Sequence, residues 1–263
     1  MQGDGSATTP AGTLGALRER LESIDWYHTQ ELAPGVITPG MFDLRPYVRR
    51  YGIPEDLSGM RALDVGTFEG FWAFELERRG ATVVALDVDR LQQLDWPPGL
   101  RPEEDSVRGE GFQLAKRAFD SGVERVGGTI YEATPEALGG TFDLVFIGSV
   151  TIHLRDPMLA LERLAALTHG RLIFADEYSR RLSAVPWEAA EFRGHTPWMT
   201  WWRPNIRGWL SMIRTAGFDD VRKHSTFFMR FNKQRGGVPH VVVHARSSAT
   251  RSAPVEQVRR YRA

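Results

Sequence analysis

The fold is decided by the stretch Leu63-Asp64-Val65-Gly66-Thr67-Phe68-Glu69-Gly70. Apolar residues from Ala62 to Val65 predict a short buried strand, and the apolar spacing from Phe71 to Arg79 predicts a helix that Gly80 ends. A strand, a turn with two glycines and a helix in direct succession form a loop in which the backbone approaches a ligand closely. This stretch therefore predicts a ligand-binding turn at the carboxyl end of a strand.

Short apolar runs alternate with helical stretches after this turn, a pattern typical of a parallel sheet covered by helices. Further strands are predicted at residues 82–86, 126–131, 144–147 and 171–174. Helices are predicted at residues 111–120, 157–168 and 206–216, and two β-rich runs at 224–231 and 240–246. We expect an α/β fold with a Rossmann-like, seven-stranded sheet that is mostly parallel and has an antiparallel C-terminal hairpin.

Composition along the chain predicts one domain with extensions at both ends. The expected regions are a disordered N-terminus at 1–12, a helical and loop extension at 13–60, the domain at 61–246 with an aromatic insert at 177–205, and a flexible tail at 247–263. Within the extension, apolar spacing from Leu14 to Ile24 predicts a helix, and the prolines and glycines between Trp26 and Gly40 predict a loop.

Composition also excludes several classes of protein. Lys plus Arg equals Asp plus Glu at 33 each, so the chain lacks the overall positive field of nucleic-acid-binding proteins. It has no Cys, which excludes disulfides, thiolate nucleophiles and Cys-ligated metals, and no H-E-x-x-H spacing, so no metal site is expected. Without a signal-like N-terminus or a long apolar run, we expect a cytoplasmic protein with no membrane partner.

The spacing of the glycines indicates which ligand the turn would bind. Gly66 and Gly70 lack the middle glycine of G-x-G-x-x-G, which disfavours a dinucleotide pyrophosphate. Asp64 at the strand end suits a ligand that carries an ammonium group, such as the methionine end of S-adenosylmethionine. Asp87, at the end of the second strand, is placed to bind ribose hydroxyls. The alternative is that both carboxylates are ordinary strand-end turn residues.

We therefore expect S-adenosylmethionine as the cofactor and S-adenosylhomocysteine as its product. Tyr131, at the expected end of the third strand, would pack on the adenine, or else would simply fill strand space. Gly148 and Ser149 would lie where the methionine end meets the substrate. The cofactor-binding residues expected are Asp64, Gly66, Thr67, Phe68, Glu69, Gly70, Asp87, Val88, Tyr131, Glu132, Gly148 and Ser149.

Three segments together resemble a known family. They are Leu63 to Gly70, the run Gly148-Ser149-Val150-Thr151-Ile152-His153-Leu154-Arg155-Asp156-Pro157, and the upstream residues Trp26-Tyr27-His28 with Gly35 to Gly40. Over residues 24 to 246 the chain resembles the CmoB-like branch of class I S-adenosylmethionine-dependent methyltransferases, which includes enzymes of the tRNA wobble uridine. The resemblance implies the seven-stranded methyltransferase fold and methyl transfer from S-adenosylmethionine.

Departures from that branch shape the expected function. Thr151-Ile152 stands where the branch has an aromatic or leucine pair, and the long N-terminal region and basic surface of the tRNA enzymes are not evident. These departures favour a small organic substrate, in bacterial secondary metabolism. The alternatives are a tRNA wobble-uridine methyltransferase or carboxymethyltransferase and a non-catalytic module that binds an adenosine ligand. A nicotinamide oxidoreductase is the weakest alternative, because its pyrophosphate loop is missing.

Candidate catalytic residues follow the fourth and fifth strands. Methyl transfer is an in-line displacement, so the enzyme aligns the nucleophile and removes its proton where needed. His153 and Glu177 are the candidate bases. Alternatively, His153 is a structural histidine bonded to loop backbone, and Glu177 pairs with Arg180 or Arg181. Asp176 would then be a structural partner of Glu177.

Aromatic residues crowd the insert, where this kind of fold often has a lid over the substrate. We expect substrate contacts from Trp26, His28, Tyr178, Trp198, Trp201 and Trp202, while some of the tryptophans pack the insert onto the domain. Exposed aromatic residues and the N-terminal helix would also suit a homodimer contact.

Overall fold

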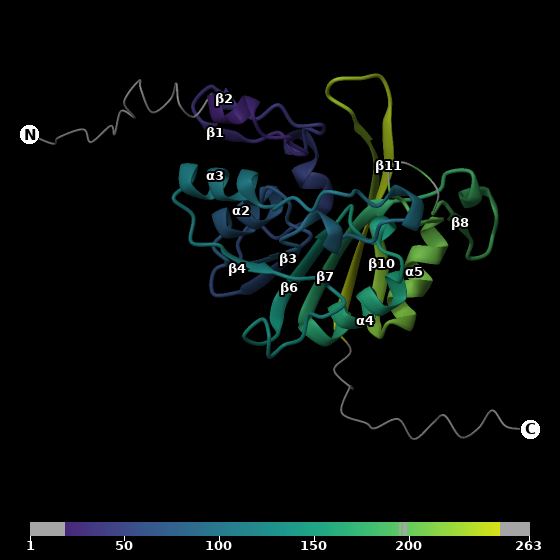
Figure 1. Cartoon of the computed structure of the whole chain (residues 1–263). Helices are drawn as coiled ribbons and strands as arrows, with labels where there is room; N and C mark the ends of the chain where they lie inside the picture. The colour runs from purple at the N-terminus through teal and green to yellow at the C-terminus, as the bar shows by residue number, and fades with distance from the viewer. Residues whose placement is uncertain (1–18, 195, 197–198, 248–263) are drawn as a thin grey trace, which may run out of the picture.

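A computed structural model of the chain describes residues 19–194, 196 and 199–247. Its centre is a seven-stranded sheet with the order β10-β11-β7-β6-β3-β4-β5 (Figure 1). The five strands from β7 to β5 are parallel, whereas β11 runs antiparallel to both of its neighbours. The predicted Rossmann-like sheet with an antiparallel C-terminal hairpin is therefore confirmed.

The stretch from Leu63 to Gly70, with the helix after it, folds as its residue pattern predicts. β3 (Arg61–Val65) is buried along its length, and α2 (Phe71–Arg78) follows after the glycine turn. The other central strands are β4 (Thr82–Asp87), β6 (Phe142–Gly148) and β7 (Thr168–Glu177). The remaining helices are α3 (Glu110–Ala118), α4 (Pro157–Leu167) and α5 (Ile206–Thr215).

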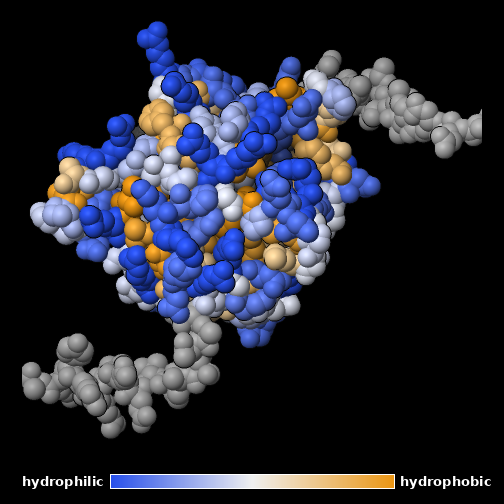
Figure 2. Space-filling model, turned by 180° about the vertical axis from the view of Figure 1, so that it is seen from behind, coloured by the Kyte–Doolittle hydropathy of each residue, from blue (hydrophilic) through white to orange (hydrophobic). Residues whose placement is uncertain are grey.

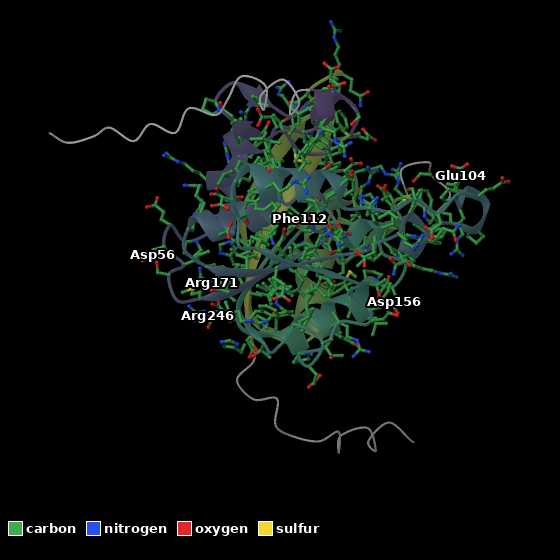
Figure 3. The ribbon with its side chains drawn as sticks, turned by 60° about the vertical axis from the view of Figure 1, so that its left-hand side comes forward. Asp56, Glu104, Phe112, Asp156, Arg171 and Arg246 are labelled. Atoms are coloured by element: carbon green, nitrogen blue, oxygen red, sulfur yellow. The ribbon has the colours of Figure 1, made fainter. Side chains whose placement is uncertain are left out.

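Helices cover both faces of the sheet and form a core on each. On one face α2 and α3 pack with the N-terminal extension, and on the other α4 and α5 pack with the C-terminal hairpin. Figure 3 shows Phe112 of α3 inside the molecule, while Arg171 and Arg246, which pair across β7 and β11, lie at its edge. Seen from behind, the surface is mostly polar and its apolar residues form separate patches (Figure 2).

The extension contains more β-structure than its sequence predicts. The segment expected as a loop holds a small antiparallel pair, β1 (Glu31–Ala33) and β2 (Val36–Ile37), turned at Gly35 with a φ of 71°. A 3-10 helix, η1 (Arg45–Tyr51), follows, and its Tyr51 packs on Trp72 of α2 with ring centroids 4.2 Å apart. The predicted helix from Leu14 begins outside the described residues.

Two strand predictions had the wrong bounds. The strand expected at residues 126–131 is β5 (Glu124–Gly127), which ends before Gly128, whose φ is 155°. The strand expected from His224 is β10 (Phe218–Arg230), and its partner is β11 (Gly237–Ser247). Bulges in β10 interrupt the alternation that would have revealed its beginning.

The insert between β7 and α5 holds one short strand pair. β8 (Ala190–Phe192) and β9 (Trp202–Pro204) run antiparallel, with a 3-10 turn, η5 (Leu182–Ala184), before them. Across the described ranges, none of the helices is both long and apolar enough to cross a membrane.

Candidate functional site

The polar residues singled out in the sequence gather at the carboxyl ends of the parallel strands. β3 lies between β4 and β6, so the strands that follow β3 in the sequence are added first on one side of it and then on the other. In sheets of this type, ligands bind in the crevice outside the carboxyl ends of the strands at such a switch point. The turn after β3 and the segments after β6 and β7 therefore meet where a ligand site is expected.

The turn after β3 has the backbone that its glycines permit. Gly66 and Gly70 have φ values of 72° and 86°, and Phe68 between them has 51°. A Cβ on Gly66 would lie 2.3 Å from a methyl carbon of Val150, and one on Gly70 would lie 2.4 Å from the ring of Phe74. The glycines are thus required by positive φ and by neighbouring side chains of the protein itself.

Asp64 presents a buried carboxyl group beside this turn. Its residue is 2% exposed, and burial raises the pKa of the carboxyl group to about 7, although nearby Thr67 and His28 lower it. Within the described part of the chain, Asp64 Oδ2 and Thr67 Oγ1 are buried without a well-formed hydrogen bond. Buried polar atoms normally have partners, so this pair points to a ligand with a hydrogen-bond donor.

Asp87 holds the turn from the end of β4. Its Oδ2 accepts a hydrogen bond from the backbone N–H of Phe68 at 2.8 Å, and its Oδ1 accepts one from Val88 at 2.8 Å. Burial raises the pKa of Asp87, and the guanidinium of Arg108, which lies 4.5 Å from the centre of the Phe68 ring, opposes the shift. Asp87 therefore links the ends of β3 and β4.

A narrow cleft of about 70 Å³ opens beside Asp87, and we name it the β3–β4 cleft. Its walls include Gly66, Val88, Tyr131 and Val150. Tyr131 lies after β5, where its hydroxyl group donates to Asp95 and accepts from the backbone N–H of Asp156. Glu132, in contrast, is exposed and accepts from Thr129.

Glu69 contacts the extension. Its carboxylate accepts hydrogen bonds from the backbone N–H of Tyr27 at 2.6 Å and from Nδ1 of His28 at 2.9 Å. Gln30 donates to the Glu69 carbonyl at 3.1 Å. Glu69, expected to bind the cofactor, and His28, expected to contact the substrate, thus bind each other.

A second cavity, of about 240 Å³, lies next to the strand ends, and we name it the Glu177 pocket. Tyr27, Phe42, Ile152 and Phe231 give it apolar walls, and Ser149, His153, Glu177, Arg193, Arg203 and His240 give it polar ones. The segment after β6 separates the two cavities, because Ser149 and His153 face this pocket while Val150 and Leu154 face the β3–β4 cleft.

Glu177 and Asp176 have different environments. Glu177 Oε1 accepts from Arg203 at 2.9 Å, so its partner is neither Arg180 nor Arg181 as the alternative interpretation expected. Asp176 is fully buried, accepts from the backbone N–H groups of Ile152 and Glu177, and has its pKa raised to about 7 by burial. Asp176 therefore holds the segment after β6 in place, while Glu177 faces the pocket.

The position of His153 fits both interpretations considered for it. Its Nδ1 lies 3.2 Å from the carbonyl oxygen of Met199, which fits the structural interpretation. Its side chain also lines the Glu177 pocket, which fits the catalytic one.

Most of the aromatic residues expected at the substrate pack elsewhere. Trp26 is buried in the core and donates to the Leu21 carbonyl. Trp201 donates to the Asp95 carbonyl and Trp202 to that of Arg155. Tyr178 packs in the core on the α4 and α5 face, and Trp198 lies outside the described residues.

Sequence reasoning missed several residues of the Glu177 pocket. Tyr27 was quoted with its neighbours but not proposed as a contact, and Arg203 and His240 had no recognisable motif around them. Phe42 and Phe231 come from the extension and from the C-terminal hairpin, and their rings lie 5.0 Å apart. Only the position of Tyr27 between Trp26 and His28 offered a signal.

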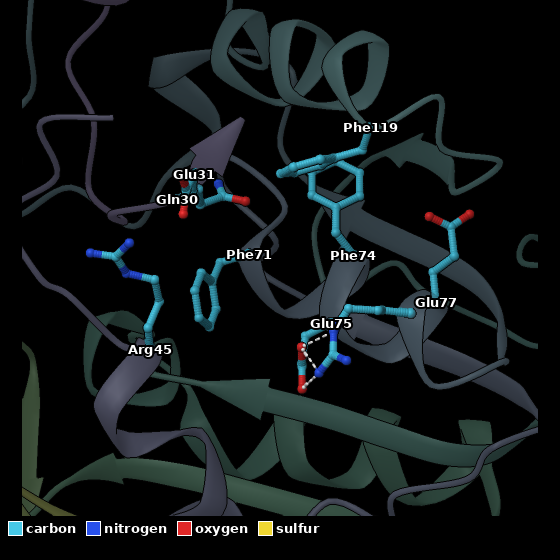
Figure 4. A pocket seen from close by; sticks show the side chains of 9 residues that line it. Gln30, Glu31, Arg45, Phe71, Phe74, Glu75, Glu77 and Phe119 are labelled. Atoms are coloured by element: carbon cyan, nitrogen blue, oxygen red, sulfur yellow. Dashed lines mark hydrogen bonds and ion pairs between the residues drawn. The ribbon is translucent and has the colours of Figure 1, made fainter. Parts of the chain in front are cut away.

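Another cavity beside α2 does not belong to this site. A cavity of about 480 Å³ lies on the outer face of that helix, lined by Arg45, Phe71, Phe74, Glu75 and Phe119 among others (Figure 4). Glu75 is paired with Arg78 and Arg79, and Arg45 with Asp43. These three charged residues are thus paired within the protein.

Comparison with known proteins agrees with the fold. No protein-family model matches the chain. The magnesium-protoporphyrin O-methyltransferase of Rhodobacter capsulatus is 33% identical over 124 residues, which are 46% of this chain and 47% of that enzyme. The chain therefore matches about half the length of this curated relative.

Solved structures match over a larger share of the chain. The N-terminal domain of EvdMO1, solved with S-adenosylhomocysteine, is 17% identical with a TM-score of 0.64, covering 93% of this chain and 100% of that one. The 1,6-didemethyltoxoflavin-N1-methyltransferase of Burkholderia thailandensis is 15% identical with a TM-score of 0.53, covering 94% and 93%. The chain thus has the Rossmann-like fold of class I methyltransferases.

Proposed function

We propose that this protein transfers a methyl group from S-adenosylmethionine to a small organic substrate. The observation that carries the proposal is the pair of adjoining cavities at the strand ends, one lined by Asp87 and one by Glu177. A methyl donor and a methyl-accepting substrate must meet in line, which adjoining cavities allow. The partial similarity to an O-methyltransferase supports the same reaction class.

The residues of the β3–β4 cleft fit the methyl donor. Asp64 does not line the cleft but lies beside its residues Val65 and Gly66, and its buried oxygen without a well-formed hydrogen bond suits the ammonium group of the methionine end. Asp87 suits the ribose hydroxyls, with Val88 and Tyr131 beside the adenine. When bound, S-adenosylmethionine supplies an electrophilic methyl group on a sulfonium. Gly66, Thr67, Phe68 and Gly70 would shape the surrounding turn, and Gly148 and Ser149 would lie at the methionine end.

The Glu177 pocket suits a small substrate. Its volume of about 240 Å³ is below the range of roughly 300 to 1,000 Å³ typical of pockets for drug-sized ligands. A substrate of one or two rings fits this size better than a tetrapyrrole. We propose Glu177 as the group that takes the proton of the nucleophile, with His153 as its neighbour on the pocket wall.

Calorimetry would test the proposed donor. We expect S-adenosylmethionine and S-adenosylhomocysteine to bind and NAD not to bind, because the turn has no pyrophosphate loop. Binding of NAD alone would contradict the proposal. A cofactor titration of Asp87→Ala beside wild type would show whether the measured binding uses the β3–β4 cleft.

Product formation would separate the classes of substrate. The protein would be incubated with S-adenosylmethionine and either small-molecule extracts or purified tRNA, and S-adenosylhomocysteine would be measured. We expect turnover only with the small molecules. Turnover with tRNA, lost at high salt, would favour the tRNA alternative related to the CmoB-like branch. Tight cofactor binding without turnover on either would favour the non-catalytic module.

A further inference from the structure

Three arginines lie together at the end of the sheet opposite to the candidate site. Arg171 is near the start of β7, and Arg246, directly across from it in β11, is near the end of that strand. Together with Arg222 of β10 they line a cavity of about 230 Å³. The six polar residues that line this cavity, which we name the Arg171 cluster, are Arg171, Asp220, Arg222, His224, His244 and Arg246.

The Arg171 cluster is separate from the Glu177 pocket. In the register of β7 and β11, Arg171 pairs with Arg246, whereas Glu177 pairs with His240. Residues 171 and 177 of β7 are six positions apart, which corresponds to about 20 Å along a strand. Figure 3 shows Arg171 and Arg246 next to each other at the edge of the molecule. A ligand bound there would therefore leave the proposed cofactor and substrate cavities free.

The cluster has more positive than negative charge. Arg171 and Arg246 point to the same face of the sheet, because they are direct partners in an antiparallel pair, and like charges in such positions are destabilising. Asp220 pairs with Arg222 and also lies 3.7 Å from Nε of Arg246. Within the part of the chain that the structure describes, Arg171 has no carboxylate at ion-pair distance. Three guanidinium groups thus share one carboxylate of the cluster.

Two stacked histidines form a fixed wall of the cavity. The rings of His224 and His244 are parallel to within 4°, with centroids 4.3 Å apart. Nε2 of His244 lies 2.8 Å from the carbonyl oxygen of Tyr51, which can only accept, so Nε2 donates to it. Gly52, with a φ of 64°, lets the extension approach the pair closely, because a Cβ there would lie 2.4 Å from Nε2 of His224. The wall is therefore held in place before any ligand arrives.

The arrangement suits an anion with several oxygen atoms. Guanidinium groups are planar forks of N–H donors that bind the oxygens of phosphate or carboxylate in pairs. Three such forks around one cavity match a tetrahedral group, which presents oxygens in several directions, better than a planar one. A bulge in β10 between Asp219 and Arg222, where Asp220 has a φ of 48°, accompanies the placement of Asp220 and Arg222 at the cavity. Bulges often redirect side chains in this way beside functional sites.

We propose that the Arg171 cluster binds the phosphate group of a small ligand, either inorganic phosphate or a phosphomonoester. The bound dianion would offset the excess positive charge and lie between guanidinium groups that otherwise repel each other. Because the cluster lies at the other end of the sheet from the Glu177 pocket, the proposal does not depend on the proposed methyl transfer.

Titration with inorganic phosphate tests the site directly. In proton NMR spectra of the full chain, the ring signals of His224 and His244 would be identified by their loss in His224→Gln and His244→Gln. We expect both signals to shift saturably with phosphate and to stay in place with sodium chloride of equal ionic strength. Equal shifts with both salts would reflect screening alone and would overturn the proposal, as would the absence of any shift.

Variants without one charge test which residues hold the phosphate. Arg171→Gln and Arg246→Gln should each raise the Kd for phosphate about 10- to 100-fold, the effect of a lost hydrogen bond between charged groups. Arg117→Gln, which changes an exposed arginine of α3, is the matched control and should keep the wild-type Kd. Unchanged affinity in both cluster variants would overturn the proposal.

Stability in phosphate-free urea shows whether Arg171 has a structural role instead. Arg171→Gln removes a like-charge contact, so its unfolding midpoint should be no lower than that of wild type. A lower midpoint would assign Arg171 to the fold and count against the proposal.

A comparison of ligands identifies the source of the phosphate group. Inorganic phosphate, glycerol 3-phosphate and acetate would be titrated in turn, and we expect acetate to bind at least about tenfold more weakly than either phosphate. A lower Kd for glycerol 3-phosphate would support a phosphomonoester, and a lower Kd for inorganic phosphate would support the free ion. Acetate binding as tightly as phosphate would overturn the ligand class. Failure of S-adenosylhomocysteine to bind would count only against the proposed function.

Discussion

The carboxylate of Glu69 accepts a hydrogen bond from Nδ1 of His28 at 2.9 Å, and both side chains are almost completely buried. The other Glu69 oxygen accepts from the backbone N–H of Tyr27. These contacts fasten the N-terminal extension to the turn after β3. The shape of that turn therefore depends on Tyr27 and His28, which precede Glu69 by 42 and 41 residues in the sequence.

Replacing Glu69 with Gln should destabilise the protein. The amide has one acceptor oxygen in place of two, so its NH₂ group faces a backbone N–H or His28. We expect the free energy of unfolding in urea to fall by about 1–3 kcal/mol. The control is Glu110→Gln, which breaks an exposed ion pair with Arg20 and should cost less than about 1 kcal/mol. Equal losses in both variants would contradict a special role for Glu69.

Stability should fall as the pH rises toward neutrality. Asp64 has a pKa of about 7 in the folded protein and about 3.9 when unfolded. Between these values the folded state holds more protons, so increasing pH favours unfolding. Asp64→Asn should therefore stabilise the protein, with a gain that grows from pH 5 to pH 8 up to about 4 kcal/mol. Denaturant titrations at both pH values check this, and a gain that shrinks with pH would refute it.

Binding of the proposed methyl donor should be coupled to loss of a proton. An ammonium group beside Asp64 favours its charged form, so binding below pH 7 releases the proton that the free carboxyl group holds. We expect affinity for S-adenosylmethionine to rise from pH 6 to pH 7, by at most about tenfold per pH unit. Calorimetry at pH 6 in buffers of different ionisation enthalpy measures the released proton. Asp64→Asn should bind more weakly and release none.

Asp87 should matter more for cofactor affinity than its exposed neighbour. Asp87→Asn keeps one oxygen and turns an NH₂ group toward a backbone N–H that Asp87 now binds. We expect the Kd for S-adenosylhomocysteine to rise about 10- to 100-fold, the effect of one hydrogen bond to a charged group. The control is Asp89→Asn, whose carboxylate pairs with Arg125 at the surface. Similar losses in both would show that Asp87 has no direct role.

Glu177 should affect turnover and leave cofactor binding intact. Once a methyl-accepting substrate is known, Glu177→Gln should lower kcat by about 10²- to 10⁴-fold, because it removes the proposed base. The Kd for S-adenosylhomocysteine should stay within about twofold, since Glu177 faces the other cavity. Glu188→Gln, at an exposed position of the same insert, should keep the wild-type kcat. An unchanged kcat in Glu177→Gln would exclude it as the base.

The residue pattern predicts the central sheet well where both faces of a strand are buried. β3, β4, β6 and β7 are recognisable as continuous apolar runs, because a strand covered on both faces needs apolar side chains throughout. β5 is less predictable, and it ends before Gly128, whose φ is 155°. β10 is obscured by its bulges and by its exposed charged face.

The candidate site likewise contains some residues whose position the sequence predicts and others whose position it does not. Asp64 and Asp87 were recognisable because each lies at the carboxyl end of its strand, and strand ends meet at one edge of a parallel sheet. Trp201 and Trp202 were expected at the substrate because they belong to an aromatic insert in the position of a lid, yet their indole N–H groups bind the backbone at Asp95 and Arg155. Neither the residue type nor its place in the insert shows which backbone group an indole N–H will bind.

The sequence by itself determined the strand-turn-helix unit around Gly66, the alternation of strands and helices, and the two acidic strand ends. These features depend on neighbours a few residues apart, so local periodicity encodes them. Only the tertiary structure decided that Glu69 binds His28 and that Ser149 and His240 meet on one wall of the Glu177 pocket. Such contacts form because the order of the strands and the packing of the extension bring together residues that no local pattern connects.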